Sequence, residues 1–225
     1  MNDTKPVQAE NLRIVMIAPT PFFADRGCHI RILGEAKALI DLGHKLILCT
    51  YFLGRDIDGI PIVRTLSVPW YNKLSAGPSW HKFYIDLLLL WRVVAVCRTF
   101  RPDVIHAHLH EGVVIGKIAS RLFRIPLVAD LQGSLTDELL AHKFIPNVAS
   151  VVKLVHWIEK KINQMAIHLI VSSKQTAQSC VDTYGISGER VSPVTDGVDL
   201  DIFSPREKDL DLQATLGIHK DGGAL

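Results

Sequence analysis

The chain has 225 residues, of which 48% are hydrophobic and 21% are charged, as in an ordinary folded globular protein. Lysine and arginine number 25 and aspartate and glutamate 23, and this near balance of charge argues against nucleic acid as a partner. The four cysteines are far apart and form no CxxC pair, which indicates buried thiols in a reducing cytoplasm.

Two segments bear on export and on membranes. The first ten residues are polar and lack the apolar core of a signal peptide. Residues 83–97 are strongly apolar, but Asp86 and Arg92 interrupt them and the stretch is short for a spanning helix, so we expect a buried helix. The alternative is contact with a membrane surface through aromatic and basic side chains of this region: Trp80, Lys82, Trp91, Arg92 and Arg98.

Short apolar runs alternate with helical patterns from residue 12 onward. The runs predict strands at 12–18, 45–51, 61–66, 103–108, 126–131, 168–172 and 190–194. Apolar residues at helical spacing predict helices at 28–42, 79–100, 112–122, 134–142, 149–165 and 174–184. This alternation predicts a single α/β domain with a doubly wound, mostly parallel, Rossmann-like sheet.

The two ends of the chain differ from its middle. Residues 1–10 form a polar tail, and residues 11–203 carry the α/β pattern. Residues 204–225 contain a polar turn and a short helical pattern, and they end in Gly-Gly-Ala-Leu as an apolar segment begins. We therefore expect residues 204–225 to be a linker towards a second domain that this chain lacks.

A loop at residues 19–27 joins the first predicted strand to the first helix, where Rossmann proteins bind phosphates. It holds one glycine, Gly27, and lacks the G-x-G-x-x-G pattern of dinucleotide sites, which disfavours nicotinamide and flavin cofactors. Two interpretations remain open. Either Gly27 is needed only for the geometry of the backbone, or the start of the helix, with Arg26 beside it, faces an anionic ligand.

Three histidines, His106, His108 and His110, occupy every second position where the fourth predicted strand ends. Because alternate side chains of a strand share a face, we expect the three imidazoles to point the same way. Their spacing resembles a metal site, but further ligands at matching places are missing, and we expect no metal. We expect His106 to be structural, and His108 is the candidate for a catalytic or substrate-orienting imidazole at the strand tip.

Polar residues also follow two later strands. Gln132 and Gly133 come after the strand at 126–131, where they line a ligand site or cap the next helix. Asp196 and Gly197 follow the last strand, and an Asp-Gly pair is typical of a tight turn. The carboxyl ends of parallel strands meet at one edge of a sheet, so we expect these residues near the histidines.

These elements, in this order, resemble the N-terminal, acceptor-binding domain of the family 4 retaining glycosyltransferases, which have the two-domain GT-B architecture. The matching segments are residues 26–44, the strand at 103–108, Val171-Ser172-Ser173, and the run from Thr195 to Asp199 with Phe203 and Pro205. The resemblance implies that a second Rossmann domain binds a nucleotide-sugar donor through paired glutamates. This sequence has no glutamate pair at the required spacing.

The resemblance also implies roles for individual residues. Gly27, beside Arg26, is expected to face the donor phosphates across the cleft, and His108 to touch the transferred sugar. Asp196 and Gly197 match the turn that leads to the interdomain linker. For the acceptor, we expect contacts from Arg31, His110, Trp80, Gln132 and Gly133.

The resemblance therefore predicts part of a hexosyltransferase-type glycosyltransferase that moves a sugar from a nucleotide-sugar donor to an acceptor with retention. A glycan or lipid of the cell envelope is the expected acceptor, and no cofactor or metal is expected. We expect a cytoplasmic protein, or one held peripherally at the inner face of the membrane, and little activity from this chain alone. Two alternatives remain: a non-catalytic Rossmann module that binds a glycan or a protein, and a histidine-dependent metal hydrolase.

Overall fold

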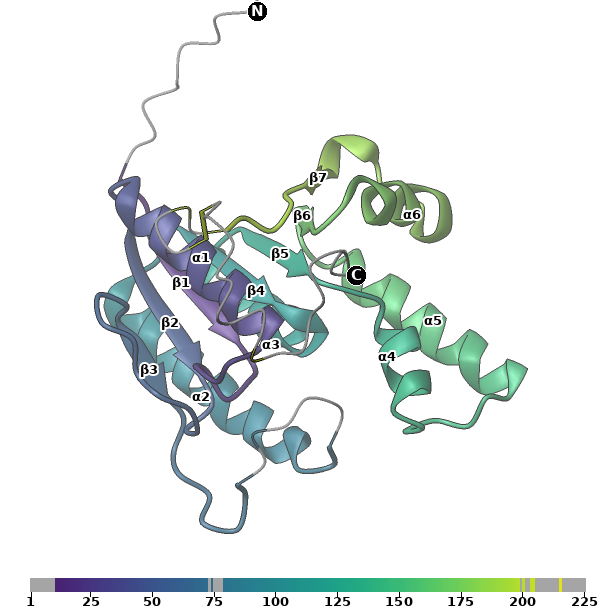
Figure 1. Cartoon of the computed structure of the whole chain (residues 1–225), viewed down its shortest axis with the longest axis horizontal. Helices are drawn as coiled ribbons and strands as arrows, with labels where there is room; N and C mark the ends of the chain where they lie inside the picture. Colours follow the sequence, from purple (N-terminus) through teal and green to yellow (C-terminus); the bar gives the residue numbers. More distant parts are fainter. Residues whose placement is uncertain are drawn as a thin grey trace, which may run out of the picture.

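A computed structural model describes residues 11–72, 74, 79–198, 200, 203, 204 and 215. Within them, seven parallel strands form one sheet in the order β3-β2-β1-β4-β5-β6-β7 (Figure 1). The strands are β1 (Arg13–Ala18), β2 (Lys45–Thr50), β3 (Ile62–Arg64), β4 (Val104–His108), β5 (Leu127–Leu131), β6 (His168–Val171) and β7 (Val191–Pro193). The strand order reverses between β1 and β4, and ligands of doubly wound folds bind beyond the carboxyl ends of strands at such a point.

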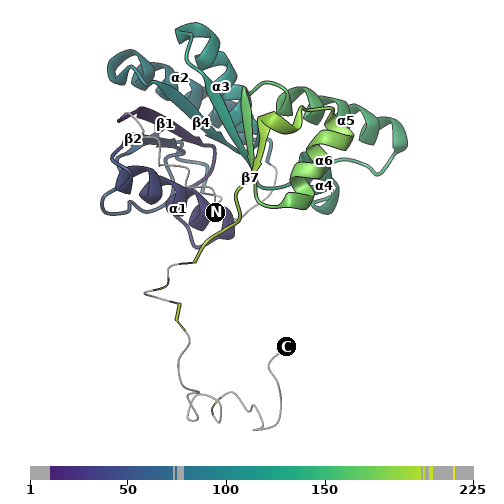
Figure 2. The ribbon, with the colours of Figure 1, turned by 90° about the horizontal axis from the view of Figure 1, so that it is seen from above.

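The same part of the chain forms six α-helices, which cover both faces of the sheet. They are α1 (Gly27–Asp41), α2 (Lys82–Phe100), α3 (Leu109–Phe123), α4 (Leu135–Ala141), α5 (Ala149–Asn163) and α6 (Lys174–Tyr184). Figure 2 shows α2 and α3 on one side of the sheet and α1 on the other. Helix α3 packs against both α2 and α5, so these three helices form one continuous layer.

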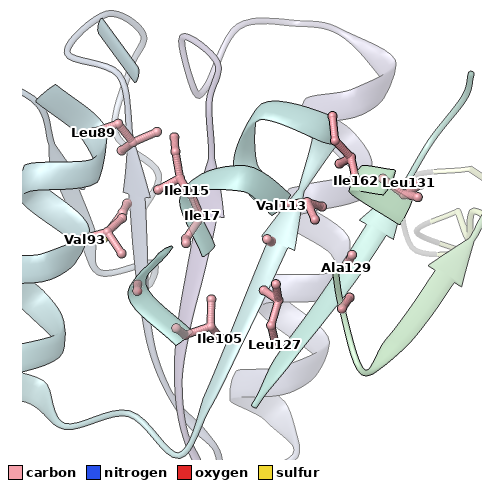
Figure 3. Packing of buried hydrophobic residues seen from close by; sticks show 14 of the residues in the cluster. Ile17, Leu89, Val93, Ile105, Val113, Ile115, Leu127, Ala129, Leu131 and Ile162 are labelled. Carbon is pink, nitrogen blue, oxygen red and sulfur yellow. The ribbon is translucent and has the colours of Figure 1, made fainter. Parts of the chain in front are cut away.

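Two apolar clusters hold the helices on the sheet. The larger lies beneath α2, α3 and α5, where Leu89, Val113 and Ile162 meet the side chains of β1, β4 and β5 (Figure 3). The smaller lies beneath α1, where Ile32 packs with Met16 and its neighbours. Because both faces of the sheet are covered, the central strands are buried on both sides and have nearly continuous apolar sequences.

A glycine allows α3 to approach the sheet closely. A Cβ atom at Gly116 would lie 2.7 Å from Cδ1 of Leu127 on β5 and 3.3 Å from Cβ of Ala107 on β4. Any larger residue would therefore push α3 outward. This close contact fixes the helix whose first turn carries His110.

The predicted fold class is confirmed, and each predicted strand and helix is present with small shifts of its bounds. The expectation that the three imidazoles point the same way is wrong. Helix α3 begins at Leu109, not at residue 112, and Leu109 has a left-handed φ of 61°. His106 and His108 remain on β4, whereas His110 belongs to the helix and lies near Glu159.

Several expectations concern other parts of the chain. The predicted polar tail at 1–10 and most of the predicted linker at 204–225 lie outside the described residues. All four cysteines are free thiols, and three of them are buried as expected, whereas Cys28 is half-buried. In the part of the chain that the structure describes, no helix is long and apolar enough to cross a bilayer.

Candidate functional site

A network of buried polar side chains occupies the carboxyl edge of the sheet at its centre. Asp130 on β5 lies opposite His108 on β4, and both side chains are fully buried. Nδ1 of His108 lies 3.1 Å from Oδ2 of Asp130, and Nε2 of Gln132 donates to the same oxygen at 3.2 Å. The carboxylate of Asp130 fixes which ring nitrogen of His108 carries the proton, because an ionised carboxylate only accepts hydrogen bonds.

Arg31 of α1 joins this network to the segment that follows β7. Its Nε and Nη2 donate to Asp130 at 3.0 and 2.8 Å. Its Nη1 donates to the carbonyl of Val194 at 2.9 Å and to Asp196 at 2.6 Å. Burial alone would raise the pKa of Asp130, but the hydrogen bonds from His108 and Arg31 outweigh it and lower that pKa well below its ordinary range.

A second group lies between α1 and β4. Oε2 of Glu35 is 3.4 Å from Nε2 of His106 and 4.0 Å from Nε2 of His108, and the two imidazole rings are 4.5 Å apart. Burial raises the pKa of Glu35 to about 7. Burial, followed by the neighbouring His108, lowers the pKa of His106 to about 3. Glu35, His106 and His108 each offer one ligand atom within 4.8 Å of the others, which is a grouping that can hold a metal ion.

His110 faces a different neighbour. Its Nε2 lies 3.8 Å from Oε1 of Glu159 on α5, and burial lowers the pKa of the imidazole. Glu159 is itself buried and accepts hydrogen bonds from the backbone amides of Leu135 and Thr136. The carboxylate therefore holds the start of α4 and the loop after β5 beside His110.

A pocket of about 360 Å³ opens at this edge of the sheet, between the loops that follow β1 and β5 and the first turn of α3, which follows β4 directly. Its walls combine cationic, acidic and neutral polar side chains with two tyrosines. The lining residues that carry charge or bear directly on the predictions are Arg26, Lys82, His110, Glu111, Gln132, Gly133 and Glu138. Nζ of Lys82 is paired with Glu111 at 2.5 Å, whereas Nη2 of Arg26 is buried without a hydrogen-bond partner.

The pocket brings together some of the predicted site residues and not others. Arg26, His110, Gln132 and Gly133 line it. His108 lies beneath it, fully buried, and its contact with a sugar stays a prediction.

The other predicted residues lie around the pocket without lining it. Arg31 is buried in the network, and its predicted acceptor contact is untested. Trp80 is 71% exposed and packs against Phe83 and Phe144. Asp196 is bound to Arg31, and Gly27 forms the first residue of α1.

Three residues of the site were not identified from the sequence. Glu35 lies four residues after Arg31 in a predicted helix, and opposite charges at this spacing form ion pairs. The sequence could therefore have identified Glu35 as a partner of Arg31. Asp130 interrupts the apolar run of a predicted buried strand, and a buried carboxylate needs a partner. This position could therefore also have been identified as a site residue. No sequence pattern indicated that Lys82 belongs to the site, because its partner Glu111 lies 29 positions away in the sequence.

The fold, a doubly wound parallel sheet with a polar pocket at its carboxyl edge, is the fold of each half of a GT-B glycosyltransferase. The sequence matches the family described as "Glycosyl transferase 4-like domain" over residues 26–197, and the chain belongs to this family. Neither the glycan-binding module nor the histidine-dependent hydrolase is favoured by this membership.

Relatives with curated names are similar over most of the chain. A D-inositol 3-phosphate glycosyltransferase of Streptosporangium roseum is 27% identical over 190 residues, which cover 81% of this chain and 43% of that protein. D-inositol 3-phosphate glycosyltransferase 2 of Catenulispora acidiphila is 30% identical over 207 residues, which cover 88% of this chain and 47% of that protein. The chain thus spans about half the length of these relatives.

Solved structures show the same fold. Sucrose-phosphate synthase from Thermosynechococcus elongatus has a TM-score of 0.69 and 17% identity, over 93% of this chain and 53% of its own. Anabaena HepE in complex with UDP and glucose has a TM-score of 0.63 and 19% identity, over 92% of this chain and 50% of its own. In both cases about half of the solved structure matches this chain, as expected for one domain of a GT-B pair.

Proposed function

We propose that this chain is the acceptor-binding half of an enzyme that transfers a hexose from a nucleotide-sugar donor to an acceptor, with retention of configuration. The observation that carries the proposal is the polar pocket at the carboxyl edge of the sheet, at the point where the strand order reverses. One structural neighbour, HepE, is described with UDP and glucose bound, which supports this donor class. No metal acts on the donor phosphates in this proposal.

The start of α1 is proposed to face the donor phosphates. Gly27 has no positive φ, and a Cβ atom added there would meet no atom within 4 Å, so neither backbone geometry nor packing within the described chain requires glycine. The partial positive charge of the helix start favours an anion, and the unpartnered Nη2 of Arg26 adds a donor. This combination supports the close approach of a diphosphate.

The acceptor is proposed to enter the pocket. Gln132 and His110 supply hydrogen-bonding groups on its walls, and an added Cβ at Gly133 would meet no atom within 4 Å. Holding an acceptor hydroxyl near the sugar turns an encounter into a nearly unimolecular step. For His108, the resemblance implies contact with the transferred sugar, and Asp130 fixes the orientation of that ring from below.

The acceptor is further proposed to be a lipid-linked molecule, because one layer of the fold suits a membrane surface. Nine apolar side chains on the layer of α2, α3 and α5 are exposed, and we call them the three-helix face: Phe83, Leu87, Trp91, Val114, Ile118, Leu122, Leu154, Trp157 and Ile158. They recur at helical spacing on each helix, so each helix presents one apolar stripe to the outside.

The charges of the same three helices fit an anionic bilayer. Their exposed charged residues are all basic: Arg98, Arg121, Lys153 and Lys161. Their acidic residues are turned inward, where Asp86 accepts from Tyr51, Glu111 pairs with Lys82, and Glu159 accepts from Thr136. Exposed tryptophans and basic side chains around an apolar stripe are typical of interfacial binding, which supports a peripheral position at the inner face of a cell membrane.

The experiment joins this chain to the carboxyl-terminal half of a relative and measures the consumption of UDP-sugars. We expect turnover from the joined protein and little from this chain alone, because half of the transition-state contacts are supplied by the other domain. His108→Ala should lose turnover far more than His106→Ala. Equal activity of both variants would remove the role proposed for His108, and no turnover from any joined protein would contradict the proposed function.

A further inference from the structure

Glu35, His106 and His108 form a cluster whose ligand atoms converge on one point between α1 and β4. Both histidine Nε2 atoms face the same oxygen, Oε2 of Glu35, at 3.4 and 4.0 Å. The cluster does not line the pocket described above. It is therefore a separate feature on the α1 side of the sheet.

The converging atoms have no hydrogen-bond partner. Nε2 of His106, Nε2 of His108 and Oε2 of Glu35 are buried without a hydrogen-bond partner, whereas Oε1 of Glu35 lies 3.1 Å from Nε of Arg31 in an ion pair. His106 is 6% exposed and His108 is fully buried. Buried polar atoms are almost always satisfied, so these three atoms around one point indicate a group that accepts their lone pairs.

His108 is already held as a metal ligand would be. Its Nδ1 is bonded to Asp130, which leaves the lone pair of Nε2 directed at the cluster. A carboxylate behind a coordinating imidazole is the usual support of a metal-bound histidine. His106 brings a second imidazole from the same face of β4.

The charge of the surroundings favours a cation. Glu35, Asp130 and Asp196 provide three carboxylates around the single guanidinium of Arg31. With all three ionised, the group carries two excess negative charges, and every member except the exposed Asp196 is largely buried. A divalent ion would balance them.

We propose that Glu35, His106 and His108 bind one divalent transition-metal ion of the zinc class, with water as a further ligand. Two imidazoles and a carboxylate are a common ligand set for zinc. Bonds of about 2.1 Å place tetrahedral ligands about 3.4 Å apart; Nε2 of His106 already lies at 3.4 Å from Oε2 of Glu35, and Nε2 of His108 must close in from 4.0 Å. The ion would tie α1 to β4 and take up Nε2 of His108, so the contact of His108 with the transferred sugar proposed above would be made by the carbon edge of the ring and not by a ring nitrogen. The ion would not contact the reacting phosphates.

The test measures metal in the 225-residue chain, freed of any affinity tag. We expect one equivalent of Zn²⁺ by elemental analysis after dialysis against Zn²⁺, and a higher melting temperature that EDTA reverses. Co²⁺ in place of Zn²⁺ should give visible absorption bands of a four- or five-coordinate site. These bands report on the wild-type chain even if a variant fails to fold.

Glu35→Gln and His106→Gln should each abolish the bound equivalent and the EDTA-sensitive rise in melting temperature. His81→Gln is the matched control, because His81 is an exposed histidine outside the cluster, and it should retain both. Absence of stoichiometric metal and of a Co²⁺ spectrum in the wild-type chain would overturn the proposal, as would unchanged metal content in both variants. Because these measurements use the chain without a donor-binding half, failure of the metal site is distinguishable from failure of the proposed sugar transfer.

Discussion

Arg31 and Asp130 form a buried ion pair that connects α1 to β5 across the carboxyl edge of the sheet. Nη2 of Arg31 lies 2.8 Å from Oδ1 of Asp130, and the two side chains are 4% and 0% exposed. The same guanidinium holds Asp196 at 2.6 Å, so one cation connects the centre of the sheet to the segment that leaves β7. The pair is thus a structural link between the polar network and the predicted interdomain turn.

Arg31→Met should destabilise the fold by about 3 kcal/mol, because it leaves the charge of Asp130 buried with no cationic partner. Urea unfolding of the chain measures the loss. Arg13→Met is the control, since Arg13 pairs with Asp103 at the exposed surface, and it should change the stability far less. Equal losses in the two variants would show that the buried pair has no special contribution.

The sequence is sufficient to predict the strands and helices, since the sheet is covered on both faces and its strands are continuous apolar runs. The start of α3 is not predictable in the same way. His106, His108 and His110 continue an alternating pattern, and only the left-handed turn at Leu109 separates the third from the other two.

The site was predictable in its location and not in its contacts. Parallel topology brings Gln132 and Gly133 near the histidine strand. Contacts such as the one between Arg31 and Asp130 join residues 99 positions apart, and they depend on how α1 is rotated over the sheet. Glu35 meets His106 for the same reason, so the ligand set proposed above could not be identified from spacing.

Asp86 should make the stability of the chain depend on pH. Burial raises the pKa of Asp86 to about 7, although a hydrogen bond from Tyr51 opposes the shift. Between pH 3.8 and about 7, Asp86 is protonated in the folded state and ionised in the unfolded state, so the folded state binds more protons. The contribution of Asp86 to the free energy of unfolding is therefore fully present below pH 3.8 and is lost as the pH rises to about 7.

Asp86→Asn removes the titrating group and keeps an oxygen for Tyr51. The stability of the variant relative to wild type should therefore rise by about 4 kcal/mol as the pH increases across this range, and stay constant outside it. Denaturant unfolding at a series of pH values measures the difference. A difference that is flat with pH would mean that Asp86 ionises normally in the folded chain.

The three-helix face predicts binding to anionic vesicles. Replacing Leu87 and Trp91 together by Gln should weaken partitioning to phosphatidylglycerol-containing vesicles at least about tenfold, because two exposed apolar side chains no longer enter the interface. Co-sedimentation measures the partitioning. Binding should be weak to purely zwitterionic vesicles and should fall with added salt, since Lys153 and Lys161 contribute through charge.

Ile30→Gln is the matched control for that experiment. Ile30 is 58% exposed, similar to Trp91 at 54%, but it lies on α1 and therefore on the opposite side of the sheet (Figure 2). It should leave vesicle binding unchanged. If Ile30→Gln reduces binding as much as the double variant does, the membrane contact is not made by the three-helix face.

The most direct measurement of the central claim compares Gly27→Ala with Gly34→Ala in the protein joined to a donor-binding half. Both glycines lie on α1 with no atom within 4 Å of an added Cβ, so neither variant should lower the melting temperature, and Gly34→Ala in the helix interior should raise it slightly. If the start of α1 faces the donor phosphates, Gly27→Ala should lower kcat/KM for the nucleotide sugar about 100-fold while Gly34→Ala leaves it unchanged. Full turnover by Gly27→Ala would contradict the account.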